Sequence, residues 1–387
     1  MRYGFPKLPF LIFLPLFIVG ITYVQIGQNE SGQFLKIFVG FFLAVVFYHY
    51  VIELFEGNVQ KLFLYYMKGA VIVSGIGIVQ IISYQIGFAP GYNYGWLLNK
   101  WSVTQGGFGI RMNSIFSEPS YFAAVIAPAF FVALYNLSSN KKLFIDRKRS
   151  IIIGVAYLLT FSSLGIFGIY LAVLLLLLNL GFFRYAILFA PIFYYSFNYS
   201  YENIPEFRQR FDGTFDIFTT QDFRNHEIHG SSFVLYNNYH VALENFKRNP
   251  VFGTGLGSHP TAFEKYSLTK LEGVVEIDFN KQDANSMALR LMSETGLYGL
   301  VFMLVFIIKC WIFKPRAAET EVWVMSNALI LIILLYLFRQ GHYFLNGFPF
   351  FLWLFYYTWK DNRAKKAARS DNESEQSGMI EVNVITP

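Results

Sequence analysis

Residues 151–180 read IIIGVAYLLTFSSLGIFGIYLAVLLLLLNL, a mostly apolar stretch without a charged residue. At about 1.5 Å per residue, one helix of this length would span roughly 45 Å, well beyond the roughly 30 Å of a bilayer's hydrocarbon core. Near its middle the stretch carries the small or polar residues Thr160, Ser162, Ser163 and Gly165. We therefore predict two short helices, broken at this point, that cross a membrane and return.

The charges on either side of the stretch require the same break. Basic clusters at 141–149 and 309–316 mark the cytoplasmic side of a membrane. A single crossing at 151–180 would leave an odd number of crossings between the two clusters, so both could not be cytoplasmic. Two crossings restore the parity and also place Arg184 on the cytoplasmic side.

The composition excludes a soluble enzyme. Of the 387 residues, 55% are hydrophobic, 20% aromatic and only 14% charged, whereas a soluble domain carries about 25% charged residues. Nine segments are apolar enough to cross a membrane, namely 8–27, 34–52, 66–88, 119–137, 151–181, 185–199, 289–311, 322–338 and 348–359. Because the 151–181 segment counts twice, we predict an all-α polytopic membrane protein with about ten transmembrane helices and cytoplasmic termini.

This topology divides the chain into four regions. Residues 1–199 form seven transmembrane helices with an outer loop at 89–118, residues 200–288 form one large extracytoplasmic loop, and residues 289–359 form three further helices. The tail at 360–387 is rich in Ser, Glu and Asn and is expected to be disordered in the cytoplasm. Since the large loop holds eight basic and twelve acidic residues, the net charge of +6 reflects cytoplasmic anchoring and not a nucleic-acid surface.

Three arginines fall outside both the cytoplasmic clusters and the large loop, at the outer ends of predicted spans. They are Arg111, Arg290 and Arg339. The planar guanidinium binds phosphate oxygens bidentately, so arginines gathered at one depth suggest a lipid-linked phosphate or pyrophosphate at the outer leaflet. The alternative is ordinary anchoring of helix ends at the membrane interface.

Two residues are candidate general bases for a transfer to a sugar hydroxyl. Glu118 precedes Pro119 at the outer end of a predicted helix, and His342 follows Arg339 by three residues. Glu118 is alternatively a helix cap paired with Arg111, and His342 alternatively a hydrogen-bonded structural histidine. We take Glu118 and His342 as the candidate catalytic residues.

Three other residues are candidates for contacting glycan. Trp96 belongs to an aromatic group in the 89–118 loop that is alternatively an interfacial belt. His259 follows the turn at 253–257, which we expect to be flexible because it contains three glycines. Tyr343 lies next to the candidate base in the late outer loop.

The sequence predicts neither a metal nor a cofactor. His226 and His229, at i and i+3, lack nearby carboxylates in a recognisable ligand pattern. The turn GTGLG at 253–257 lacks the spacing and the flanking strand of a nucleotide fingerprint. Cys310 is the single cysteine, which excludes an intramolecular disulfide framework.

Several motifs resemble those of Wzy-type O-antigen and capsular polysaccharide polymerases. In chain order they are RMNSIFSEPSYF at 111–122, TFSSLG at 160–165, NPVFGTGLG at 249–257, DANS at 283–286 with ETGLYG at 294–299, and RQGHY at 339–343. The DANS segment resembles O-antigen ligases as well, but where many ligases have a histidine this chain has Ala284. The resemblance therefore favours a polymerase over a ligase.

This resemblance implies a fold like that of GT-C glycosyltransferases and a metal-independent, inverting transfer of glycan from undecaprenyl pyrophosphate. The reaction would take place on the extracytoplasmic side of the bacterial cytoplasmic membrane, with Arg111 and Arg339 holding the pyrophosphate. The resemblance does not fix Arg290, which we expect to be a third ligand from its position at the outer end of a predicted span. Expected partners are the undecaprenyl-pyrophosphate-linked oligosaccharide, the lipid bilayer and a chain-length-regulating co-polymerase. The alternatives are an O-antigen ligase that transfers polymer to lipid A core, and a lipid-linked oligosaccharide transporter.

Overall fold

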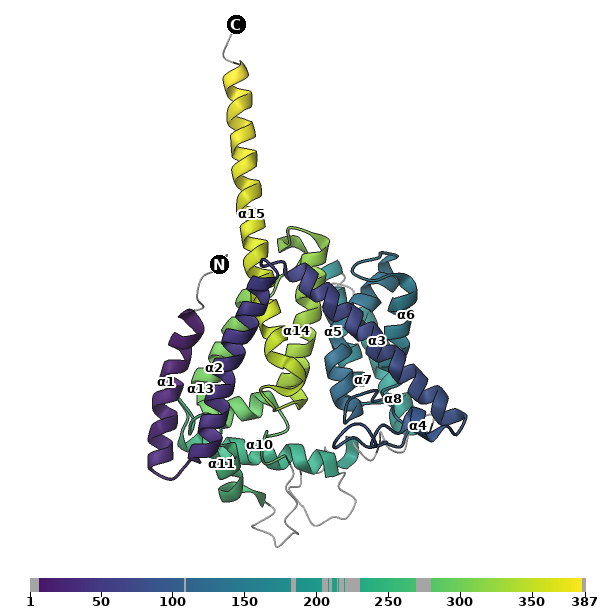
Figure 1. Ribbon diagram of the computed structural model, residues 1–387, viewed down its shortest axis with the longest axis vertical. Helices are drawn as coiled ribbons and strands as arrows, with labels where there is room; N and C mark the ends of the chain where they lie inside the picture. The colour runs from purple at the N-terminus through teal and green to yellow at the C-terminus, as the bar shows by residue number, and fades with distance from the viewer. Residues whose placement is uncertain are drawn as a thin grey trace.

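The computed structural model describes residues 7–107, 109–181, 186–203, 208, 211–213, 215, 219, 230–268 and 280–384. Within these residues the chain is mostly helical and has no β-strand, only an isolated bridge between Gln105 and Ile110. Six helices of the described part are long and apolar enough to cross a membrane: α2 (Ser31–Leu54), α3 (Val59–Gln85), α5 (Pro119–Ser139), α7 (Ser163–Leu180), α13 (Met287–Cys310) and α14 (Thr320–Arg339). The chain is therefore an all-α protein with the character of a multi-pass membrane protein (Figure 1).

The other four predicted spans also coincide with helices. These are α1 (Lys7–Gln25), α6 (Arg147–Leu158), α8 (Ala186–Asn203) and the first part of α15 (Phe348–Val384). α6 has only 12 residues, about 18 Å of helix, so it crosses at most part of a hydrocarbon core. That all ten helices cross the membrane stays a prediction.

The break in the 151–181 stretch is confirmed. α6 ends at Leu158 and α7 begins at Ser163, and between them Phe161 adopts a left-handed conformation with φ of 43°. The segment before α5 holds this turn in place, because the backbone N–H of Met112 donates to the Leu159 carbonyl at 3.0 Å. The far end of α7 returns to the 309–316 segment, where the Lys314 N–H donates to the side chain of Asn179 at 2.8 Å.

α14 forms the centre of the helical body and packs against α5, α7, α13 and α15. Its side chains are buried along most of its length, as are those of α5, whereas α2 and α3 expose a large share of theirs. One buried polar group on α14 joins it to two neighbouring segments: the Asn327 side chain accepts from Asn179 at 2.9 Å and from Trp311 at 3.0 Å. Such satisfied polar contacts fix the register between helices without leaving buried groups unpaired.

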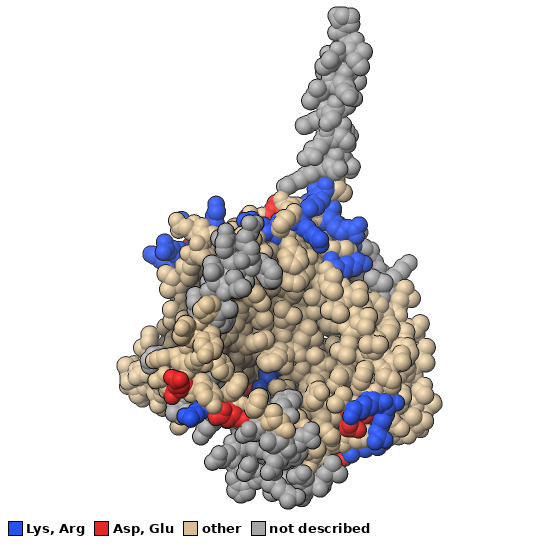
Figure 2. Space-filling model, turned by 180° about the vertical axis from the view of Figure 1, so that it is seen from behind, with Lys and Arg blue, Asp and Glu red and all other residues tan. Residues whose placement is uncertain are grey.

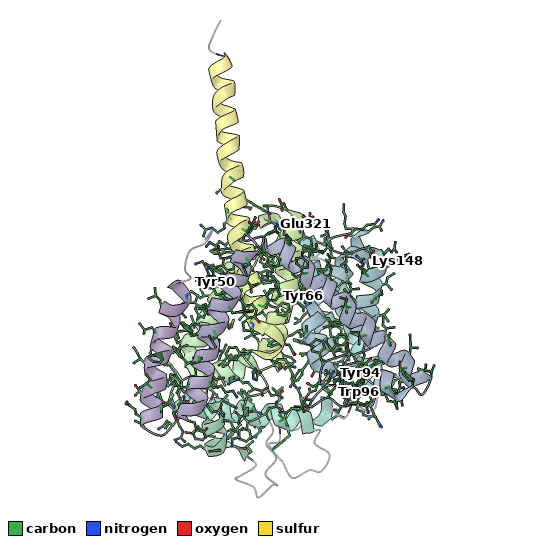
Figure 3. All side chains as sticks on the ribbon, in the orientation of Figure 1. Tyr50, Tyr66, Tyr94, Trp96, Lys148 and Glu321 are labelled. Atoms are coloured by element: carbon green, nitrogen blue, oxygen red, sulfur yellow. The ribbon has the colours of Figure 1, made fainter. Side chains whose placement is uncertain are left out.

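The two ends of the body differ in charge. Basic side chains gather at the end from which α15 extends (Figure 2), where Lys148 also lies (Figure 3). Tyr94 and Trp96 lie at the other end (Figure 3), which is crossed by α10 (Gly230–Arg248), with α11 (His259–Tyr266) beside it (Figure 1). This asymmetry is what the positive-inside rule expects of a protein whose 200–288 loop faces outward.

The helix α15 continues beyond the apolar segment to Val384, and disorder of the tail in the cytoplasm stays a prediction. Its first turns beyond the apolar part are tied down. Lys365 makes ion pairs with Glu319 at 3.0 Å and with Asp361, one helical turn away, at 3.2 Å. The tail also contains no proline before residue 384.

Candidate functional site

The site is built on the first turns of α13. The Ser286 hydroxyl accepts from the Leu289 N–H and caps the helix. Arg290 and Glu294 follow in the helix, and because they are four residues apart they lie on one helix face. The Arg290 Nε donates to the Glu294 Oε1 at 2.9 Å, and the two side chains are only 3% and 0% exposed. This is a buried ion pair, and each charge needs further partners to be tolerated there.

Those partners come from two distant parts of the chain. The second oxygen of Glu294 accepts from the Tyr343 hydroxyl at 3.0 Å and from the Gly257 N–H at 2.9 Å. Arg290 donates from Nη1 to the Gly341 carbonyl at 3.1 Å and lies over the Tyr343 ring, 4.2 Å from its centre. One ion pair therefore joins α13, the turn at 253–257 and the loop after α14.

The glycine turn is buried and tightly packed, not flexible as predicted. Gly253, Gly255 and Gly257 all have positive φ, and a Cβ on Gly253 would lie 2.5 Å from the Glu294 backbone. A kink in α13 receives the turn: Gly296 has φ of 59° and ψ of −149°, and a Cβ there would lie 2.7 Å from the Gly253 nitrogen. Glycine is required at 253 and 296 because the backbones of the turn and of α13 approach too closely there to leave room for a Cβ.

His342 lies half-buried beside this network. Its Nδ1 accepts from the Phe344 N–H at 3.2 Å. Burial lowers the pKa of His342 below its ordinary 6.5, and the positive charges of Arg290 and Lys36 lower it further, while the Asp283 carboxylate opposes them. The imidazole is therefore neutral at pH 7, with charged groups of both signs within electrostatic reach.

Glu118 lies at the start of α5 but does not cap it. Its carboxylate is exposed and accepts from the Ser120 hydroxyl at 2.9 Å, and no helix N–H donates to it. The Tyr121 ring is within electrostatic reach of both Glu118 and Asp283, so the start of α5 lies near the segment that precedes α13. The predicted alternative, a cap paired with Arg111, is wrong.

The three arginines do not share one environment. Arg290 is buried and bound to protein groups, so in this geometry it is not presented to a substrate. Arg111 is half-buried against the α6–α7 turn, where its Nε donates to the Thr160 carbonyl at 3.4 Å. Arg339 is the last residue of α14 and is half-buried at the same end of the molecule.

The three predicted glycan contacts fall into two groups. Trp96 is 71% exposed, but the neighbouring Trp101 is buried with its Nε1 donating to the Ser114 carbonyl, so the aromatic group is no continuous platform. His259 and Tyr343 are both buried. Burial, reinforced by Arg290, lowers the pKa of His259 to about 3, and its Nε2 contacts the Asn238 side chain at 3.0 Å. His259 is thus a buried, hydrogen-bonded histidine in this structure.

A polar cavity of about 400 Å³ lies beside the glycine turn, at the end opposite the basic clusters. Its lining combines amide, hydroxyl and charged groups with one aromatic ring: Gly27, Gln28, Asn245, Thr254, Thr261, Ala262, Glu264, Lys265 and Tyr266. Planar polar groups beside an aromatic face suit a sugar, so this cavity is a better candidate for glycan contact than the buried His259. In the part of the chain that the structure describes, no group of three His, Cys, Asp or Glu residues is placed to hold a metal, and His226 and His229 lie outside that part.

Sequence reasoning missed Glu294, Asp283 and Lys36 as members of the site. The Arg290–Glu294 spacing of four residues was the available signal for the ion pair, since such pairs meet on one helix face. Asp283 and Glu294 also begin the DANS and ETGLYG motifs, which were used for the family resemblance and not for the site, whereas Lys36 gave no comparable signal. Comparison of the chain with models of known protein families gave no match, and comparison with curated proteins gave none either.

Proposed function

We propose that this chain is an extracytoplasmic polysaccharide polymerase of the bacterial cytoplasmic membrane. It moves a growing glycan from its undecaprenyl pyrophosphate carrier to a sugar hydroxyl of the next lipid-linked repeat unit. The observation that carries the proposal is the position of His342: a half-buried imidazole in the loop after α14, between Gly341, whose carbonyl accepts from Arg290, and Tyr343, whose ring centre lies 4.2 Å from the Arg290 guanidinium. A neutral base among cations suits a reaction that removes a proton and releases an anion.

In the proposed reaction the acceptor hydroxyl attacks the anomeric carbon of the donor glycan. The new glycosidic bond forms as the bond from that carbon to the pyrophosphate oxygen breaks, with inversion at the carbon. His342, or else Glu118, takes the acceptor proton. Arg111 and Arg339 hold the departing pyrophosphate, whose negative charge grows in the transition state.

Arg290 has a different role in this proposal from the one expected from sequence. Its guanidinium is committed to Glu294 and to the Gly341 carbonyl, so it positions the loop that carries His342. Its positive charge also adds to the effect of burial in lowering the pKa of His342. We propose the polar cavity beside the glycine turn as the subsite for a sugar of the donor or acceptor chain, and a chain-length-regulating co-polymerase as the protein partner.

Deletion of the gene followed by gel analysis of the surface glycan tests the proposal. Loss of a polymerase leaves surface glycan capped with single repeats. Loss of a ligase instead leaves unattached, lipid-linked polymer, and loss of a transporter leaves intermediates trapped on the inner leaflet. Either of these last two patterns would contradict the proposed function.

A further inference from the structure

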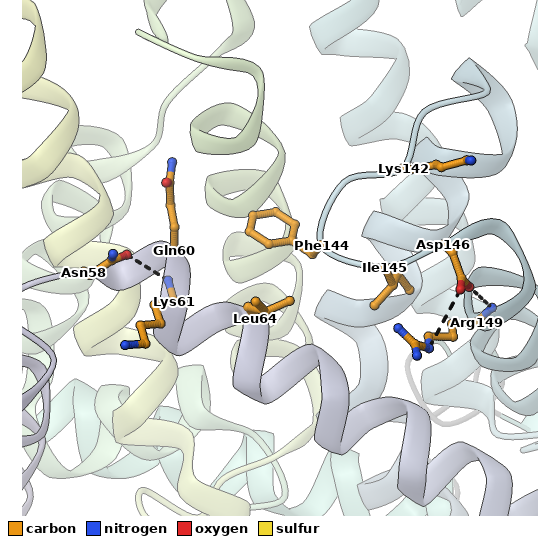
Figure 4. A pocket seen from close by; sticks show the side chains of 9 residues that line it. All are labelled: Asn58, Gln60, Lys61, Leu64, Lys142, Phe144, Ile145, Asp146 and Arg149. Atoms are coloured by element: carbon orange, nitrogen blue, oxygen red, sulfur yellow. Dashed lines mark hydrogen bonds and ion pairs between the residues drawn. The ribbon is translucent and has the colours of Figure 1, made fainter.

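A second cavity, of about 610 Å³, lies at the basic end of the body between the start of α3 and the segment that leads into α6 (Figure 4). It is remote from the proposed catalytic site, which is at the other end. The residues that line it are Asn58, Gln60, Lys61, Leu64, Lys142, Phe144, Ile145, Asp146 and Arg149. Three of these are cations and one is a carboxylate, so the cavity carries a positive excess.

The carboxylate is occupied by its own helix. Asp146 accepts from the Arg149 N–H at 2.8 Å as the cap of α6, and its other oxygen lies 4.0 Å from the Arg149 Nε. Within the described residues, Lys61 and Lys142 form no ion pair; the Lys61 ammonium lies 6.0 Å from the centre of the Phe55 ring. Two lysines on the rim are therefore not neutralised by an acidic side chain.

The other part of the lining is apolar. Leu64, Phe144 and Ile145 lie between the cationic residues (Figure 4). The helices that border the cavity also expose large apolar side chains close to it in sequence: Tyr65 on α3 is 49% exposed and Ile151 on α6 is 48% exposed. A ligand that fits carries a negative charge at one end and hydrocarbon at the other, a combination found in an anionic phospholipid and absent from a free phosphate.

We propose that this cavity binds the phosphate headgroup of an anionic phospholipid from the cytoplasmic leaflet. Lys61, Lys142 and Arg149 contact the headgroup, while the start of an acyl chain lies on Leu64 and Phe144. Basic pockets between transmembrane helices on the cytoplasmic side are suited to such headgroups, and each basic residue near an anionic surface contributes about fivefold to binding. This inference is independent of the proposed polymerase activity.

The test is native mass spectrometry of the full-length protein in detergent, titrated with phosphatidylglycerol or with phosphatidylcholine. The wild-type protein should retain phosphatidylglycerol in preference to phosphatidylcholine. The triple variant Lys61→Gln/Lys142→Gln/Arg149→Gln should bind phosphatidylglycerol about 100-fold more weakly, the product of three fivefold contributions. Its control, Lys141→Gln/Arg147→Gln/Lys148→Gln, removes the same charge from the same segment at residues that do not line the cavity, and it should bind nearly as the wild type does.

A single substitution separates loss of lipid binding from misfolding of the triple variant. Lys142→Glu changes one exposed residue in the loop between α5 and α6, so the helices should remain intact while the rim charge is reversed, and phosphatidylglycerol binding should fall. Equal loss in the two triple variants would indicate unspecific attraction to a basic surface and overturn the proposal. Displacement of the lipid by millimolar inorganic phosphate would overturn it too, since it would assign the cavity to a free anion.

Discussion

The Arg290–Glu294 pair organises the site although neither residue is exposed. Buried ion pairs add little stability by themselves, since desolvation of both charges offsets their attraction, but removing one partner leaves the other buried and uncompensated. Glu294 accepts from three groups that come from three parts of the chain. The Glu294 carboxylate therefore holds α13, the glycine turn and the loop after α14 in one arrangement.

We expect Glu294→Gln to destabilise the protein by about 3–5 kcal/mol, because the buried Arg290 loses its counterion. Thermal or denaturant unfolding of the detergent-solubilised protein measures this. Glu244→Gln is the matched control, since Glu244 pairs with Lys247 at 2.7 Å on an exposed helix face and such pairs contribute little. Similar effects of the two variants would show that the buried pair is not special.

The pH dependence of activity tests His342 as the base. Because its pKa is lowered, the neutral and active form persists as pH falls through 6.5 and is lost only below the lowered value. Glycan elongation should therefore stay constant from pH 7.5 to about pH 6.5 and decline at more acidic pH. His342→Gln should lower the rate by about 100-fold to 10,000-fold and remove that decline. If Glu118→Gln removes the decline while His342→Gln keeps it, Glu118 is the base.

Replacing Arg339 by lysine separates a phosphate ligand from a helix anchor. Lysine keeps the positive charge but loses the planar fork, so Arg339→Lys should reduce elongation by about 100-fold to 1000-fold, by analogy with loss of a donor that acts in the transition state. An anchoring role would leave activity nearly unchanged, since lysine also reaches the interface. The measurement compares polymer ladders at wild-type expression, with Lys100→Gln in the outer loop as a control.

At the residue scale, sequence predicted the candidates better than their surroundings. Arg290 was predicted as a cation at the outer end of a span and Tyr343 as a glycan contact in the late outer loop, but the sequence did not indicate that they contact each other in the interior. His259 illustrates the same limit, because a histidine after a glycine turn is compatible with either exposure or burial. Burial depends on the segments that fold over a residue, and a single sequence does not contain that information.

At the element scale, two short motifs set the geometry. The turn at 253–257 and the kink at Gly296 approach each other so closely that neither tolerates a Cβ. The break between α6 and α7 depends similarly on a left-handed residue, Phe161. The break was predictable, because length and charge parity both required it. The rigid packing of the glycine turn was not, because its partner lies about 40 residues away in another helix.

Gly296→Ala tests whether the turn depends on the kink. Alanine is strained at φ of 59°, and its Cβ would lie 2.7 Å from the Gly253 nitrogen and the Pro250 carbonyl oxygen. We expect a loss of at least 2 kcal/mol, that is about 1–3 kcal/mol of backbone strain plus the contact, and a turn that is cleaved faster by limited proteolysis. Gly75→Ala, inside α3 with nothing within 4 Å of its Cβ, should be neutral or slightly stabilising. Equal behaviour of both variants would contradict the close packing.

At the scale of the whole molecule, the membrane character and the positions of the helices could be predicted from composition and charge distribution. A chain with so few charged residues needs an apolar solvent for most of its surface, and each of the ten predicted segments coincides with a helix. For the tail, the composition predicts disorder, and this stays a prediction, although α15 extends into it as far as Val384. How the helices pack around α14 was not predictable, since apolar patterns do not distinguish a lipid-facing side from a protein-facing one.

The proposed polymerase activity is tested most directly by elongation in vitro. A strain that lacks the protein supplies its lipid-pyrophosphate-linked single repeats, which are incubated with the purified protein in detergent and EDTA and separated on a gel. We predict a ladder of longer lipid-linked glycans with release of undecaprenyl pyrophosphate, and no ladder with Arg339→Lys at equal concentration. Lipid-linked repeats that stay single in the presence of active, folded wild-type protein would contradict the account.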